Sequence, residues 1–169
     1  MKRRYKEAAP SKLYVEDAGG SYTRASDAQL IAAATSAVAR VLTRGGDWSS
    51  TKSARRLLPA LLGACEWEVF CLAHLDNRHK LIHFEELSRG TISGASVHAR
   101  EVVRSVIRWN SAAVICVHNH PSGNATASQA DELITTRIKE ALALIDVKLL
   151  DHLIVGGTEV NSLSERGLL

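Results

Sequence analysis

The segment Ala112–Val117 most restricts how this chain can fold, because it is an unbroken apolar run that ends abruptly in polar residues. Its sequence, "AAVICV", has the length and composition of a buried strand. Two histidines separated by a single asparagine, His118 and His120, end the run. Pro121 and Gly123 then favour a sharp turn away from it. We therefore expect a buried strand that ends in two imidazoles.

The region around this strand alternates between strand and helix patterns. "EVFCLAHLD" and "KLIHFEEL" predict a hairpin, and "HAREVVRSVIRWN" has valines and isoleucine at helical spacing. After the buried strand, a helix over about 128–145, the strand "VKLLDHLIVG" and a short strand near 159–163 are expected. This order predicts an α/β layered domain in which helices flank a mixed sheet.

The first third of the chain predicts a different organisation. Residues 1–25 contain Gly19 and Gly20 but no sustained periodicity, which indicates a flexible lead. Ser26 is a typical N-cap for the alanine-rich helix that follows, and a second helix is expected over about 50–64, with Pro59 as a kink or a late start. The expected parts are a lead over 1–25, two N-terminal helices over 26–65 and a core domain over 66–169.

The composition of the 169 residues, 46% hydrophobic and 23% charged, is that of a globular protein with a sizeable core. No apolar run approaches the roughly 20 residues of a transmembrane helix, and no apolar segment follows the basic N-terminus as it would in a secretory signal. The three cysteines lie in apolar surroundings without zinc-site spacing, which predicts reduced thiols. We therefore expect a cytoplasmic protein that does not associate with a membrane.

The charge pattern gives little support to a nucleic-acid partner. The net charge is only +3, and the clearest basic cluster is Lys2–Lys6. Basic and aromatic residues are not interleaved as they are in single-strand binding proteins. DNA binding stays open but is not indicated, and nothing in the sequence predicts the oligomeric state.

The two histidines and a nearby aspartate have the spacing of a metal site. Residues i and i+2 of a strand face the same side, so His118 and His120 should project together. Asp131 lies in the first turn of the helix that begins near Ser128, next to the strand end. Two imidazoles and one carboxylate leave a fourth position of tetrahedral zinc open. Spacing alone leaves the plainer alternative open, in which Ser128 and Asp131 only cap a helix.

The quoted motif resembles a known family. "HNHPSGNATASQAD" is similar to the His-x-His-Pro…Ser-x-x-Asp motif of the JAMM (JAB1/MPN) metalloproteases. The wider run "EELSRGTISGASVHAREVVRSVIRWNSAAVICVHNHPSG", with "LLDHLIVG" after it, resembles the bacterial RadC family, most closely its short members that consist of the JAB domain. The resemblance covers about 66–169 and implies a JAB1/MPN-like, cytidine deaminase-like fold.

The resemblance also implies roles for individual residues. His118, His120 and Asp131 match the ligands of one zinc ion per chain, and Ser128 matches the serine that hydrogen-bonds the developing oxyanion. Proline is usual in the family where this chain has Ala99 and Ala127. Neither position is a ligand, so the departure concerns the order of the loops and not metal binding.

The family also requires a glutamate on the first strand of the domain to act as general base. Glu68 matches that place best, and Glu66 on the same strand face is its rival. Glu85 and Glu86, at the end of the second strand, are weaker alternatives.

The activity that the resemblance implies is hydrolysis of a peptide or isopeptide bond in a peptide or protein substrate, through a zinc-activated water. Two other classes stay open: a DNA-associated accessory protein, and a binding module in which metal is structural or absent. The substrate cannot be read from the sequence, and bacteria lack the ubiquitin that many JAMM relatives cut.

Overall fold

The computed structural model of this chain describes residues 13–16, 19–46, 48, 51–90 and 97–169. They divide into two units, with the boundary between Ala39 and Arg40. The basic cluster Lys2–Lys6 lies outside the described residues. None of the helices in the described part is long and apolar enough to cross a membrane.

The N-terminal unit contains regular structure in a segment whose sequence predicts a flexible lead. Strands β1 (Tyr14–Glu16) and β2 (Tyr22–Arg24) form an antiparallel hairpin inside the predicted lead. The two strands are short and exposed on all their residues, so they show no buried face from which a periodic pattern could arise.

Helix α1 (Asp27–Leu42) begins at the predicted cap. The N–H of Gln29 donates to Ser26 Oγ (3.3 Å), and the N–H of Ser26 donates to Gln29 Oε1 (2.9 Å). This reciprocal pair is a capping box, with glutamine at its third position.

The second unit is built on a five-stranded mixed sheet in the order β4-β3-β5-β6-β7. Its strands are β3 (Val69–Leu75), β4 (Leu81–Arg89), β5 (Ala113–Asn119), β6 (Lys148–Gly156) and β7 (Glu159–Ser162). β3 runs antiparallel to β4 and β5, whereas β5 and β6 are parallel because a helix connects them. The predicted mixed α/β architecture is confirmed.

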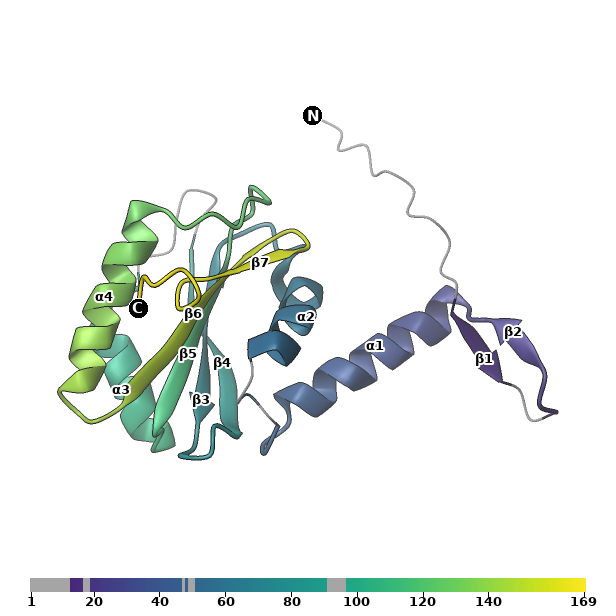
Figure 1. Cartoon of the computed structure of the whole chain (residues 1–169), viewed down its shortest axis with the longest axis horizontal. Coiled ribbons are helices and arrows are strands. Elements are labelled where there is room, and N and C mark those ends of the chain that lie inside the picture. The colour runs from purple at the N-terminus through teal and green to yellow at the C-terminus, as the bar shows by residue number, and fades with distance from the viewer. Residues whose placement is uncertain (1–12, 17–18, 47, 49–50, 91–96) are drawn as a thin grey trace. The chain divides into compact units, whose positions relative to one another are not determined.

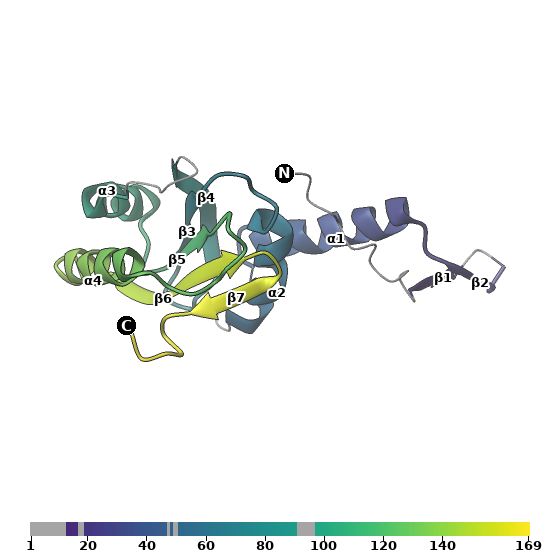
Figure 2. The same cartoon turned by 90° about the horizontal axis from the view of Figure 1, so that it is seen from above.

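Helices cover both faces of this sheet (Figures 1 and 2). Helix α2 (Thr51–Leu62) packs on one face, and α3 (Ala99–Trp109) with α4 (Gln129–Ala143) packs on the other. Pro59 lies inside α2, whose start at Thr51 excludes the predicted late start at the proline.

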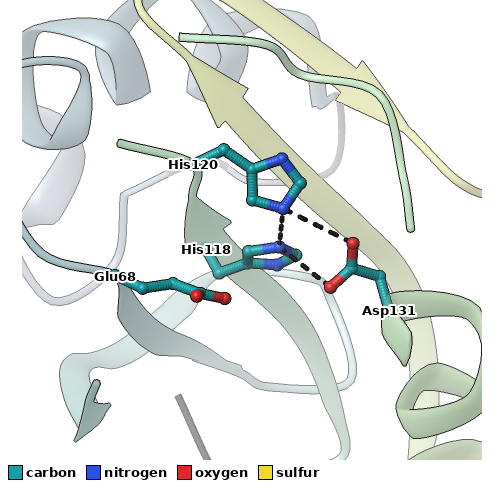
Figure 3. A group of neighbouring side chains, drawn as sticks. All are labelled: Glu68, His118, His120 and Asp131. Carbon is teal, nitrogen blue, oxygen red and sulfur yellow. Dashed lines mark hydrogen bonds and ion pairs between the residues drawn. The ribbon is translucent and has the colours of Figure 1, made fainter. Parts of the chain in front are cut away.

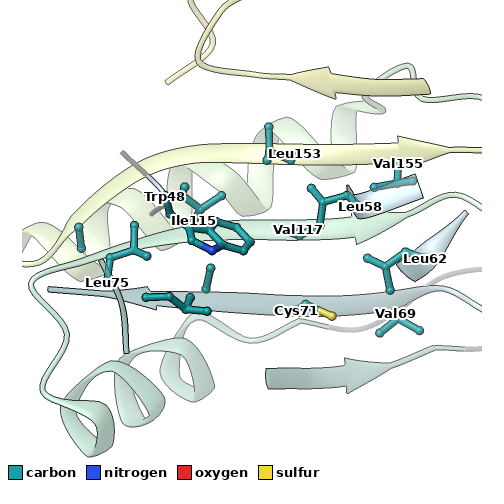
Figure 4. Close-up of a cluster of buried hydrophobic side chains, with 13 residues drawn as sticks. Trp48, Leu58, Leu62, Val69, Cys71, Leu75, Ile115, Val117, Leu153 and Val155 are labelled. Carbon is teal, nitrogen blue, oxygen red and sulfur yellow. The ribbon is translucent and has the colours of Figure 1, made fainter. Parts of the chain in front are cut away.

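The buried strand β5 supplies side chains to two separate cores. Ile115 and Val117 face α2 and pack with Trp48 and Leu58 in the cluster of Figure 4. Val114 and Cys116 face α3 and α4. Each fully buried apolar side chain contributes about 1.5–3 kcal/mol. This alternation determines the side from which the residues at the end of β5 emerge.

Burial keeps two of the three thiols unreactive. Cys71 and Cys116 are buried within the sheet, and all three cysteines are free. Burial, together with the nearby charge of Glu86, raises the pKa of Cys71 to about 12. The expectation of reduced core cysteines agrees with this environment.

Candidate metal centre

The two histidines at the end of β5 emerge on the side of the sheet that α4 covers. His118 is buried and shares its face with Val114 and Cys116, because side chains two residues apart in a strand point the same way. His120 lies just past the strand, where its N–H donates to Val155 O (2.8 Å). The Nε2 atoms of the two histidines are 2.9 Å apart.

A carboxylate at the start of β3 joins them. Asn119, between the two histidines, accepts the N–H of Val69 at Oδ1 (2.8 Å) and donates from Nδ2 to Trp67 O (3.1 Å). These two bonds hold the backbone on either side of Glu68. One ligand atom from each of Glu68, His118, His120 and Asp131 lies within 4.8 Å of the others (Figure 3).

The rival glutamates lie elsewhere. Glu66 is exposed and is not part of this group. Glu85 hydrogen-bonds His74 (3.1 Å) inside a different polar cluster. Glu86 is exposed and pairs with an arginine of its own strand. Of these four candidate glutamates, the structure therefore places only Glu68 beside the histidines.

Asp131 both caps α4 and faces the imidazoles. Its N–H donates to Ser128 Oγ (3.2 Å), while its Oδ2 accepts from the N–H and the hydroxyl of Ser128 (2.7 Å each). The carboxylate also lies 3.2 Å from His118 Nε2 through Oδ1 and 3.4 Å from His120 Nε2 through Oδ2. The helix N-terminus favours its negative charge. The capping box and the candidate ligand are thus the same carboxylate, and the two alternatives from the sequence coexist.

The loop between β5 and α4 holds His120 from its other side. His120 Nδ1 lies 2.8 Å from the carbonyl oxygen of Asn124, which can only accept, so Nδ1 carries the proton. Asn161 of β7 donates to Ala125 O (3.1 Å) and attaches this loop to the sheet. The loop also crosses directly over Gly156, where a Cβ would lie 2.3 Å from Ala125 N and 2.5 Å from the Asn124 carbonyl carbon.

We expect Gly156→Ala to destabilise the fold and to weaken metal binding, because the added methyl displaces the backbone that accepts from His120. Overpacking of this kind costs about 1–3 kcal/mol. Urea unfolding and zinc titration measure the two effects. Gly157→Ala is the matched control: its Cβ would meet nothing closer than 3.9 Å, although its φ of +59° costs about 1–2 kcal/mol. Equal zinc affinities in the two variants would contradict the expectation.

A third histidine, His152 of β6, supports His118 from behind. His152 is fully buried, and its Nε2 lies 2.8 Å from His118 Nδ1. Its Nδ1 lies 2.5 Å from Thr135 Oγ1, which in turn donates to the carbonyl oxygen of Asp131 (2.5 Å). Because the Thr135 proton is used on that carbonyl, Nδ1 of His152 must donate and its Nε2 must accept.

This chain of hydrogen bonds determines where the protons lie. If His152 Nε2 accepts, His118 Nδ1 carries a proton and His118 Nε2 has a lone pair. The same holds for His120, whose Nδ1 proton is bound by the loop. Two lone pairs 2.9 Å apart beside a carboxylate repel one another unless a proton or a cation lies between them. Imidazole and carboxylate donors of this kind suit zinc, and three of them leave one position open.

The pKa values indicate that this group of side chains favours a positive charge between them. Hydrogen bonding to Asp131 raises the pKa of His120 above its ordinary value despite partial burial. Burial raises the pKa of Asp131, but the interactions of this carboxyl with His118 and His120 outweigh burial and hold its pKa well below the usual range. Burial lowers the pKa of His152 well below normal, which keeps this imidazole neutral.

We expect His152→Ala to weaken zinc binding by about 10- to 100-fold, as is usual when the hydrogen-bond partner of a ligating imidazole is lost. Competition with a chromophoric chelator measures the affinity. His74→Ala is the matched control, because His74 is an equally buried histidine of the same sheet that bonds Ser111 (2.8 Å) and not the metal group. Equal losses in the two variants would show a general folding effect instead.

The remaining polar residues of the sheet have structural contacts. Asp151 accepts from Ser162 Oγ (2.7 Å) and from the N–H of Ser164 (3.0 Å), so it fixes the chain after β7. His74, Glu85 and Ser105 bond one another between β3, β4 and α3. Ala99 and Ala127 stand where the family usually has proline, and the helices next to them begin regularly. Helix α3 begins at Ala99 itself, and α4 begins after Ala127 with a complete capping box.

Comparison with known proteins agrees with this geometry. Residues 48–168 match the family model described as "RadC-like JAB domain". A UPF0758 protein of Nitrosococcus oceani is 56% identical over 128 residues, which are 76% of this chain and 57% of that protein. One from Halorhodospira halophila is 56% identical over the same length. One from Vibrio cholerae is 45% identical over 141 residues, 83% of this chain and 89% of that protein.

A mixed sheet with helices on both faces and a His-x-His…Asp group at a strand end defines a JAB-type domain with a candidate metal centre. The chain belongs to the RadC family of JAB-domain proteins. It spans 57% of the length of the first two of those relatives and most of the Vibrio protein.

Proposed function

We propose that this chain is a zinc-dependent hydrolase that cleaves a peptide or isopeptide bond. The observation that carries the proposal is the convergence of two imidazole lone pairs and the Asp131 carboxylate, with a second carboxylate, Glu68, beside them. The similarity of the motif to JAMM metalloproteases supports the same reaction class.

His118, His120 and Asp131 would hold one zinc ion. When bound, zinc supplies a Lewis acid that polarises a carbonyl group and lowers the pKa of water toward about 7. His152 and Asn124 keep the two imidazoles oriented with their Nε2 atoms toward this position. Because Glu68 accepts no hydrogen bond from the imidazoles of His118 and His120, its carboxylate is available for proton transfer.

Glu68 takes a proton from the attacking water at its carboxylate and returns it to the leaving amine nitrogen. A general base in such a position contributes about 10²- to 10⁴-fold in rate. Ser128 would donate its hydroxyl proton to the developing oxyanion, which requires it to leave Asp131 Oδ2. Exchange of this bond between two acceptors couples the helix cap to the reaction.

A peptide mixture of known composition tests the proposal. We expect the zinc-loaded chain to produce new peptide termini detectable by mass spectrometry, and we expect EDTA to stop cleavage and added zinc to restore it. A chain that binds one equivalent of zinc and cuts nothing would instead favour a binding module. A salt-dependent shift of DNA would favour an accessory role.

A further inference from the structure

A groove begins at Glu68 and runs along α4 away from the metal group. Its volume is about 310 Å³, which is at the small end of the range for ligand pockets. Phe70 lies at its base. Its walls are the segment Val97–His98 before α3 and one face of α4, formed by Ala130, Leu133, Ile134 and Arg137. Glu68 belongs both to this groove and to the candidate ligand group of Glu68, His118, His120 and Asp131. A molecule that occupies the groove therefore lies beside that group.

The walls near Glu68 are apolar. Leu133 is 52% exposed, and Phe70 and Ile134 line the same groove. An apolar side chain placed among these residues removes their surface from water, at about 25 cal/mol per Å² buried. The groove therefore favours an apolar side chain next to the reacting bond.

Arg137 provides a positive charge further along the same helix face. Its side chain is exposed and has no ion pair or hydrogen bond to any residue in the described part of the chain. The N-terminus of α3, whose N-cap His98 makes no side-chain capping bond to described residues, adds positive potential on the opposite wall. A guanidinium that lacks a partner in a groove is suited to a carboxylate.

The helix sets the distance between the two features. Arg137 lies six residues after the ligand Asp131, or about 9 Å along the helix axis at about 1.5 Å per residue. An extended peptide covers that distance in about three residues at about 3.3 Å each. Glu68 at the near end of the groove repels a carboxylate placed closer.

From these features we propose that the substrate is a peptide segment with an apolar side chain adjacent to the cleaved bond and a carboxylate two or three residues further along, which binds Arg137. The carboxylate belongs either to an acidic side chain or to the end of the peptide. This inference rests on the proposed function for the identity of the reacting bond, but the binding preference itself can be measured without cleavage.

Fluorescein-labelled peptides and the full chain test it by fluorescence anisotropy. The parent is Ser-Gly-Leu-Gly-Asp-Gly with an amidated end, and its comparators replace Leu by Gly or Asp by Asn. A further pair, Ser-Gly-Leu-Gly-Gly as the free acid and as the amide, tests the terminal carboxylate. We expect the apolar residue to improve binding about fivefold and the carboxylate about tenfold. If only one of the two carboxylates, the Asp side chain or the free C-terminus, improves binding in an Arg137-dependent way, that carboxylate is the one that Arg137 binds.

Two variants with matched controls assign these preferences to the groove. Arg137→Gln should abolish the preference for a carboxylate, whereas Lys139→Gln, on the same helix but outside this groove, should retain it. Leu133→Ser should reduce the preference for leucine, whereas Leu144→Ser, at the exposed end of α4, should not. Equal affinities for all the peptides, or equal losses in Arg137→Gln and Lys139→Gln, would overturn the inference.

Mass spectrometry of the same samples separates this inference from the proposed function. Selective binding without any cleavage by the zinc-loaded chain would support the groove and contradict the hydrolase. Cleavage of all the peptides without selectivity would support the hydrolase and contradict the proposed role of the groove.

Discussion

The His120→Ala variant is expected to bind zinc about 100- to 1000-fold more weakly than the wild-type chain. Structural zinc sites with four protein donors gain about 10–16 kcal/mol, or roughly 2.5–4 kcal/mol per donor, and we expect the loss of His120 to cost a similar amount. His120 is only partly buried, and its loop partner Asn124 is exposed, so water can replace the lost hydrogen bond. The variant should therefore remain folded.

Elemental analysis and competition with a chromophoric chelator measure this effect. We expect about one zinc per wild-type chain, as three protein ligands around a single ion imply. His98→Ala is the matched control, because it removes an exposed imidazole from the adjacent groove without contact to the group. A His120→Ala chain that retains zinc at wild-type affinity would contradict the assignment of His120 as a zinc ligand. A wild-type chain that takes up no zinc when zinc is supplied would do the same.

The Glu68→Gln variant is expected to retain zinc but to lose about 10²- to 10⁴-fold in the rate of peptide hydrolysis. Glutamine has nearly the same shape as glutamate but cannot accept a proton at neutral pH. Asn119 holds the backbone on both sides of this residue, so the substitution should not move the strand. The rate is measured on the peptide that the mixture experiment identifies as cut most rapidly.

Glu66→Gln provides the decisive comparison for that experiment. Glu66 lies two residues earlier, is exposed and is not part of the candidate ligand group that contains Glu68. We expect this variant to retain activity within about twofold, because Glu66 lies outside the group and surface substitutions change stability by only about 0.5 kcal/mol. An inactive Glu66→Gln chain beside an active Glu68→Gln chain would transfer the role of general base to Glu66. Full activity in both variants would show that neither carboxylate is the base.

The sequence alone predicted much of the second unit, because the signals there are local. Strand β5, which the apolar run predicted, is buried over its whole length, and the alternation of its side chains places His118 and His120 on one side. The Ser128–Asp131 spacing predicted the start of α4, since a capping box depends only on residues three apart. The hairpin at Tyr14–Arg24 was missed because its short, exposed strands have no buried face to produce a pattern.

Other parts of the candidate metal centre depend on contacts between segments that are distant in the chain. His152 reaches His118 because β5 and β6 pair in parallel with Cys116 opposite His152, a register that the intervening helix and both cores determine together. Only the register places His152 there and turns Asp151 toward Ser162.

The residue types and their local order were thus determined by the sequence: a buried strand, two histidines at its end and an aspartate in the next helix turn. Tertiary structure decided which glutamate joins them, which tautomer each imidazole adopts, and that a groove with Arg137 leads away from Glu68. The physical reason is that a strand or a cap arises from interactions within a few residues. Tautomers and grooves arise only where separate elements pack against one another.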